Sequence, residues 1–157
     1  MARDTTDQTP VTSVSELTEY LAGGNKPKEA FRIGTEHEKF VFYTADNSPV
    51  PYAGDAGILT LLEGMQQKTG WEPIIDAGHL IGLVEPTGRG AISLEPGGQF
   101  ELSGAPVETL HETCKESNTH LAVLRDIAEP LGIRFLGIGG SPTWTLAETP
   151  RMPKSRY

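Results

Sequence analysis

Two glutamates near the start of this 157-residue chain have the spacing of paired metal ligands. Glu36 and Glu38 alternate in the stretch RIGTEHEKFVF. If this stretch is a β-strand, residues two apart share one face, at a Cα separation of about 6.5–7 Å. An isolated Glu-X-Glu pair more often marks a solvated strand face. A second stretch of the same character is therefore needed to favour a cation site.

The stretch AISLEPGGQFELSG, residues 91–104, supplies that second strand. One face is apolar and carries Ile92, Leu94, Pro96, Gly98, Phe100 and Leu102. The other face is polar and carries Ser93, Glu95, Gly97, Gln99, Glu101 and Ser103. Buried carboxylates without partners repel one another and take up protons, whereas a divalent cation removes this conflict. Oxygen-only ligands favour Mg²⁺, Mn²⁺ or Ca²⁺ over zinc.

The surrounding pattern predicts an α+β fold with a largely antiparallel sheet and flanking helices. The expected helices cover 14–22, 58–70 and 106–129, and the expected strands cover 31–43, 71–75, 80–85, 91–104 and 133–138. Segments 80–85 and 91–95 are expected to form a hairpin. Proline and glycine interrupt the polar stretch at 96–98, as a bulge or a bend. One extra residue there would place Glu95 and Glu101 on opposite faces.

Composition limits the classes of partner. The net charge is −8 and no dense basic run occurs, which argues against nucleic acid and anionic membranes as partners. The only cysteine, Cys114, excludes an intrachain disulfide and indicates a reducing compartment. It lies on the apolar stripe of a predicted helix, so we expect it in the core. No signal peptide or bilayer-spanning run is found, and residues 1–13 are expected to be a flexible tail. Together these features predict a cytoplasmic protein.

A basic cluster near the end of the sequence contains Arg151, Lys154 and Arg156. These side chains could bind phosphate or a substrate carboxylate, although an isolated cluster is more often a solvated loop. His37 points away from the two glutamates on its strand, which favours a structural role. No P-loop or dinucleotide-binding fingerprint is present.

Five blocks of the chain resemble glutamate–cysteine ligases of the plant and proteobacterial type. They are RIGTEHEKF at 32–40, ISLEPGGQFELSGAP at 92–106, ETLHETC at 108–114, FLGIG at 135–139 and MPKSRY at 152–157. The resemblance implies an ATP-dependent carboxylate–amine ligase that joins L-cysteine to the γ-carboxylate of L-glutamate through an acyl phosphate. This reaction is the first step of glutathione biosynthesis. The resemblance also implies a glutamine synthetase-like fold whose antiparallel sheet forms a carboxylate-lined funnel.

The resemblance assigns roles to the residues singled out above. Glu36, Glu38, Glu95 and Glu101 are expected to bind Mg²⁺, with Mn²⁺ as the alternative metal. Gln99 and Glu101 are expected to contact the substrate. The cluster of Arg151, Lys154 and Arg156 is expected to contact ATP. The expected partners are L-glutamate, L-cysteine and ATP, with no nucleic acid or membrane; the oligomeric state is not predicted.

Members of this family have much longer chains. Residues 14–157 are therefore expected to be the N-terminal part of a single catalytic domain, inactive by itself. A single cysteine also predicts that the intrachain regulatory disulfides of plant members are absent. Two alternatives stay open. One is a related ligase that joins a different amine to glutamate, and the other is a non-catalytic fragment that binds a metal ion or an amino acid.

Overall fold

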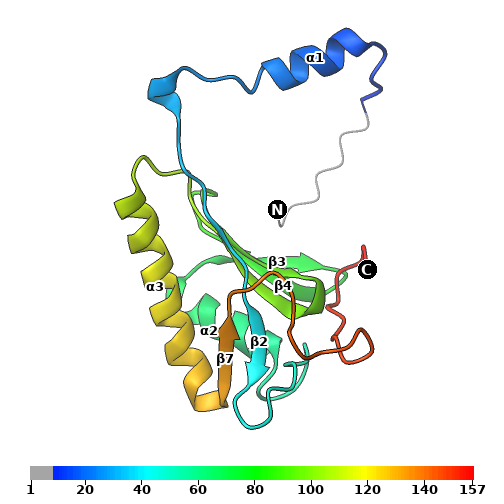
Figure 1. Cartoon of the computed structure of the whole chain (residues 1–157), viewed down its shortest axis with the longest axis vertical. Coiled ribbons are helices and arrows are strands. Elements are labelled where there is room, and N and C mark those ends of the chain that lie inside the picture. The colour runs from blue at the N-terminus through cyan, green and yellow to red at the C-terminus, as the bar shows by residue number, and fades with distance from the viewer. Residues whose placement is uncertain (1–8) are drawn as a thin grey trace.

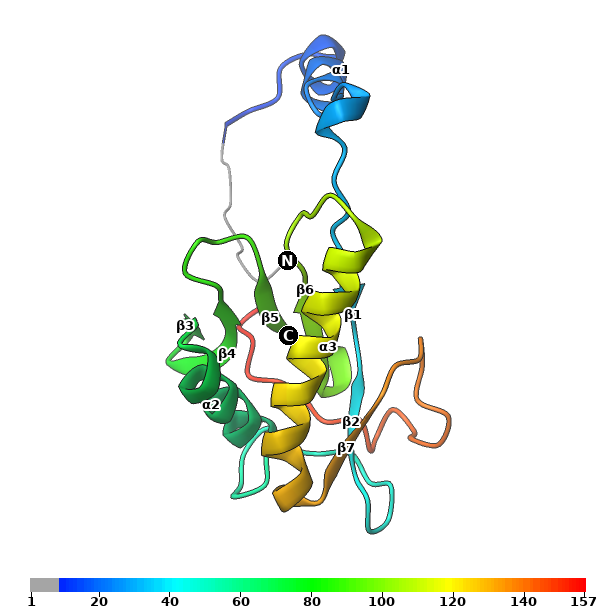
Figure 2. The same ribbon diagram turned by 90° about the vertical axis from the view of Figure 1, so that its left-hand side faces the viewer.

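The computed structural model describes residues 9–157, in which helices pack on one side of an antiparallel sheet (Figures 1 and 2). The sheet has five strands in the order β1-β6-β5-β4-β3. These strands are β1 (Glu36–His37), β3 (Glu72–Asp76), β4 (His79–Val84), β5 (Ala91–Glu95) and β6 (Gln99–Ser103). All four pairings between them are antiparallel, so the predicted α+β class with an antiparallel sheet is confirmed.

The predicted strand over 31–43 is divided between two sheets. Its first part, β1, pairs with β6 in the large sheet. Its second part, β2 (Phe40–Tyr43), pairs antiparallel with β7 (Ile133–Leu136) in a separate two-stranded sheet. The prediction of one continuous strand was therefore wrong. The chain changes sheets between His37 and Phe40 because a distant strand offers the second half its hydrogen-bonding partner.

The predicted strand over 91–104 is a hairpin. The chain reverses in a short 3₁₀ turn, Pro96–Gly98, in which Gly97 and Gly98 have φ angles of 79° and 77°. Glycine adopts such angles without steric cost, which explains the pair of glycines at this reversal. Cross-strand partners share a face. Because Glu95 pairs with Gln99, the odd-numbered residues of both strands stay together and the predicted polar face survives the reversal.

The helices follow their sequence signals. Helix α1 (Val14–Ala22) begins after Ser13, whose hydroxyl accepts the Glu16 N–H. Helix α2 (Ile58–Thr69) ends at Gly70 in the left-handed conformation. Helix α3 (Leu110–Ala128) begins later than predicted, because Thr109 and Glu112 form a capping box there. Two further short 3₁₀ turns lie at Lys28–Ala30 and Glu129–Leu131.

The core lies between helices α2 and α3 and the apolar face of the large sheet. It is formed by buried side chains that include Leu61, Leu62, Met65, Ile92, Leu94, Phe100 and Leu124. The first half of α3 extends beyond this core, since Leu110 is 69% exposed. Cys114 lies in that half and is exposed, so its prediction as a core residue was wrong.

Helix α1 stands away from the sheet and the other helices (Figures 1 and 2). Its apolar side chains, among them Val14 and Leu21, are exposed. Of the predicted tail, residues 1–8 lie outside the described residues, and residues 9–13 adopt neither helix nor strand. Within residues 9–157 no helix is both long and apolar enough to cross a membrane.

Gly82 is expected to be required for the close pairing of strands β4 and β5. A Cβ atom at this position would overlap the backbone carbonyl oxygen of Ile92, so Gly82→Ala must push the two strands apart. We expect a loss of about 1–3 kcal/mol in the free energy of unfolding, measured by urea titration. Gly139→Ala is the control, because a Cβ there meets open space. Equal unfolding midpoints for the two variants would contradict this role of Gly82.

Candidate active site

Three of the four predicted glutamates lie on one side of the large sheet. Ser93 of β5 pairs with Glu101 of β6, and Ser103 of β6 pairs with Glu36 of β1. Because alternate residues share a face, Glu36, Glu95 and Glu101 all project to the same side. We call this the carboxylate face and include Glu38 and Gln99 in it. The strand register thus brings three of the four predicted glutamates to one face, whereas their metal and substrate roles stay predictions.

Glu38 joins this group although it lies just beyond the end of β1. Glu38 is exposed, but its slight shielding from water raises the pKa of its carboxyl group, and the charges of Glu101, Glu95 and Glu36 raise it further. Repulsion between like charges disfavours ionisation, which is why the other three carboxylates act on Glu38 in this direction. A group of like-charged carboxylates favours the binding of a cation.

Glu101 is the most enclosed member of the carboxylate face, with 2% of its surface exposed. It accepts hydrogen bonds from the hydroxyl groups of Ser93, at 2.8 Å, and Ser103, at 2.6 Å. Burial alone would raise the pKa of Glu101, but the hydrogen bonds from Ser103 and Ser93, together with the charge of Lys154, lower it. The two hydroxyl groups therefore hold this buried carboxylate in place and favour its ionised form.

The predicted basic cluster lies beside the carboxylate face. Lys154 Nζ and Arg156 Nη2 lie 3.6 Å and 3.8 Å from Glu95 Oε1. Between them, Ser155 donates its N–H and its hydroxyl to Asp76 Oδ2, at 2.7 Å and 3.0 Å. Three consecutive residues thus attach the 154–156 segment to the sheet. The third predicted cation, Arg151, is exposed and forms no ion pair within residues 9–157.

Sequence reasoning left three contributors to this site without a role. Ser93 and Ser103 hold Glu101, and their places in the polar alternation were a usable signal. Asp76 anchors Ser155 across 79 residues of sequence, and no local pattern indicates that contact. Together, these three residues hold the Glu101 carboxylate and the 154–156 segment in place.

The carboxylates do not form a closed metal cage. Among residues 9–157, no group of three or more His, Cys, Asp or Glu side chains is arranged to hold a metal ion unaided. Magnesium in phosphate-transfer sites commonly takes only one or two carboxylates and completes its shell with water and substrate phosphates. The carboxylate face fits a magnesium ion of this second kind, because it offers several separate carboxylates beside cationic side chains.

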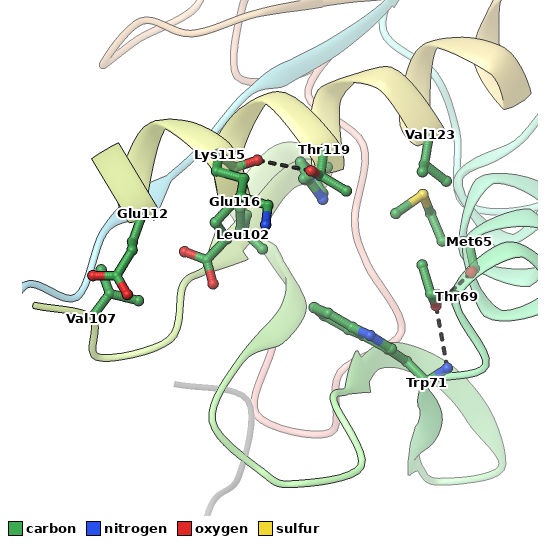
Figure 3. A pocket seen from close by; sticks show the side chains of 11 residues that line it. Met65, Thr69, Trp71, Leu102, Val107, Glu112, Lys115, Glu116, Thr119 and Val123 are labelled. Carbon is green, nitrogen blue, oxygen red and sulfur yellow. Dashed lines mark hydrogen bonds between the residues drawn. The ribbon is translucent and has the colours of Figure 1, made fainter. Parts of the chain in front are cut away.

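A mostly apolar pocket lies on the opposite side of the sheet. Its volume is about 400 Å³, and Trp71, Met65 and Val123 contribute to its walls (Figure 3). Leu102 also lines it, and Leu102 alternates along β6 with Glu101 and Ser103. The pocket therefore lies on the helix side and is separate from the carboxylate face.

Comparison with known proteins identifies the family of this carboxylate-bearing α+β chain. Residues 32–157 match the profile of glutamate-cysteine ligase family 2, and the chain belongs to this family. It is 50% identical over 142 residues to the chloroplastic glutamate–cysteine ligase A of Oryza sativa subsp. japonica. The corresponding enzymes of Nicotiana tabacum and Arabidopsis thaliana are 51% and 50% identical over 142 residues. Each match covers 90% of this chain but only 26–28% of the relative. The resemblance seen in the sequence is thereby confirmed.

The comparison corrects the predicted location. The three relatives are named as chloroplastic enzymes, which contradicts the prediction of a cytoplasmic protein. That prediction rested on a single cysteine and on the lack of a hydrophobic signal sequence. Neither feature separates the two compartments, because plastid targeting sequences are amphipathic rather than hydrophobic.

Proposed function

We propose that this chain forms the carboxylate-lined part of the active site of an ATP-dependent glutamate–cysteine ligase. The reaction joins the amine of L-cysteine to the γ-carboxylate of L-glutamate, the first step of glutathione biosynthesis. The observation that carries the proposal is that glutamates from two separate family motifs lie on one side of one sheet. Family membership and about 50% identity to plant glutamate–cysteine ligases support it.

In the proposed reaction, the γ-carboxylate oxygen of glutamate attacks the terminal phosphorus of ATP, giving an acyl phosphate and ADP. The cysteine amine then attacks the acyl carbon, loses a proton and displaces phosphate, which forms the amide bond. Neither step needs a nucleophile from the protein. The protein must instead hold two anions together and stabilise the charge that develops between them.

The carboxylate face meets this requirement by binding metal ions through its negative charges. When bound, Mg²⁺ or Mn²⁺ neutralises phosphate oxygens and orients them. Glu36, Glu38, Glu95 and Glu101 hold such ions in this proposal, and the amide of Gln99 contacts glutamate together with Glu101. Gln99 is the cross-strand partner of Glu95, which supports its place in the substrate site.

The basic cluster completes the charge balance. Lys154 and Arg156 already lie beside Glu95, within reach of a phosphate or carboxylate bound on the same face. Together with Arg151 they are assigned to ATP. The antiparallel sheet with helices on one side is consistent with the glutamine synthetase-like fold that we propose for the complete catalytic domain, of which residues 14–157 form the first part.

The proposal is tested on the full-length enzyme with L-glutamate, ATP and a panel of amines. We expect ADP release that requires both L-glutamate and L-cysteine, with γ-glutamylcysteine identified by mass spectrometry. Chelation of divalent ions with EDTA should abolish the reaction, and added Mg²⁺ should restore it. If ADP release is tenfold or more faster with another amine than with L-cysteine, that amine is the substrate and not cysteine. Absence of ADP release with every amine would overturn the ligase function.

A further inference from the structure

Lys39 is the most unusual buried residue of this protein. Only 1% of its surface is exposed, although it directly follows the Glu36–Glu38 pair. Its backbone carbonyl accepts the N–H of Phe100 at 2.8 Å, and its charge lowers the pKa of His120 on α3. The side chain therefore lies in the interior of the protein.

The ammonium group of Lys39 holds one particular backbone atom. Its Nζ donates a hydrogen bond to the carbonyl oxygen of His37 at 2.6 Å. This carbonyl stands between Glu36 and Glu38, at the point where the chain leaves β1 and the large sheet. Backbone carbonyls that leave a sheet in the interior need another donor, and Lys39 provides it.

This arrangement is energetically expensive. No carboxylate of residues 9–157 lies within ion-pair distance of Lys39, so its ammonium group is buried with the His37 carbonyl as its hydrogen-bond partner. An apolar side chain of similar length would fill the same space without desolvating a charge. Filling space therefore does not by itself account for a lysine at this position.

We propose that Lys39 is a positioning residue that fixes the backbone between Glu36 and Glu38 and so sets the separation and direction of their carboxylates. The proposal rests on the proposed function in one respect, because the carboxylate pair is taken to bind a divalent ion. Lys39 itself touches neither the ion nor the substrates. Its effect on them passes through the carbonyl group of His37.

The test measures Mn²⁺ binding to the full-length enzyme by electron paramagnetic resonance, with a non-hydrolysable ATP analogue present. Lys39→Met keeps the length of the side chain but removes the donor, and we expect it to weaken Mn²⁺ binding at least tenfold. Lys39→Arg keeps a charged donor, and we expect Mn²⁺ binding within threefold of wild type. Turnover of Lys39→Met should recover at high Mg²⁺, which shows a shift in metal requirement.

Leu124→Val is the matched control, since Leu124 is fully buried on α3 but its side chain has no donor for the His37 carbonyl. It should lower the melting temperature and leave Mn²⁺ binding within twofold of wild type. Unchanged Mn²⁺ binding in Lys39→Met, or an equal loss in Leu124→Val, would overturn the proposal. Should Lys39→Met fail to fold, Lys39→Gln takes its place, because its shorter amide cannot reach the carbonyl. A wild-type enzyme that makes no γ-glutamylcysteine would instead refute the proposed function.

Discussion

Glu36→Gln or Glu38→Gln in the full-length enzyme is expected to reduce γ-glutamylcysteine formation by about 10²–10³-fold at physiological Mg²⁺. Glutamine keeps the size of the side chain and removes its charge, so the loss is confined to cation binding. Slight shielding from water and the charges of three other carboxylates, Glu101, Glu95 and Glu36, raise the pKa of Glu38. Removing one charge weakens the attraction for a divalent ion held on this face.

The fold should survive both substitutions, because Glu36 and Glu38 are exposed and their exchange removes repulsion. We expect changes below about 0.5 kcal/mol in the free energy of unfolding. Glu63→Gln, an exposed acid on α2, is the control and should retain wild-type turnover. Initial rates measured across a Mg²⁺ series decide the question. Near-wild-type rates for Glu36→Gln and Glu38→Gln at every Mg²⁺ concentration would refute their assignment as metal ligands.

His120 is expected to make the protein sensitive to acid. Burial, followed by the charges of Lys39 and His37, lowers the pKa of His120 to about 3. Between pH 6.5 and this value, the folded state keeps the imidazole neutral while the unfolded state protonates it. The unfolded state therefore binds more protons, and stability falls as the pH falls. At pH 5 the expected loss from this one residue is about 2 kcal/mol relative to pH 7.

His120→Leu should remove this loss, since leucine fills a buried site without titrating. The measurement compares urea unfolding at pH 7 and pH 5 for the wild type and the variant. A residual dependence is expected because the pKa of His37 is also lowered by burial. His111→Leu, an exposed position on the same helix, is the control and should follow the wild type. Parallel pH profiles for His120→Leu and wild type would show that His120 does not cause the sensitivity.

The residues of the candidate site could be predicted from the sequence more completely than the fold around them. Alternation along 91–103 correctly assigned Glu95 and Glu101 to one face, since side-chain period is a local property. The sequence left open a bulge or a bend at the Pro-Gly-Gly segment and did not predict a full chain reversal, because all three use the same residue types. The structure shows the reversal.

The errors arose where distant contacts decide the outcome. The strand over 31–43 is divided because β7, about 90 residues further along, pairs with its second half. Cys114 has helical core spacing, yet the buried residues of α3 begin only at His120, so Cys114 is exposed. The attachment of Ser155 to Asp76 likewise joins two segments whose local patterns are unrelated.

The tight reversal at Pro96–Gly98 also limits which lengths this loop tolerates in related proteins. Inserting or deleting one residue would change which side chain stands opposite Glu95. Strand β6 would then turn Glu101 into the hydrophobic interior and Phe100 toward solvent, unless a bulge absorbed the change. Natural variation in this loop should therefore proceed in steps of two residues, a pattern that sequencing of distant family members can check.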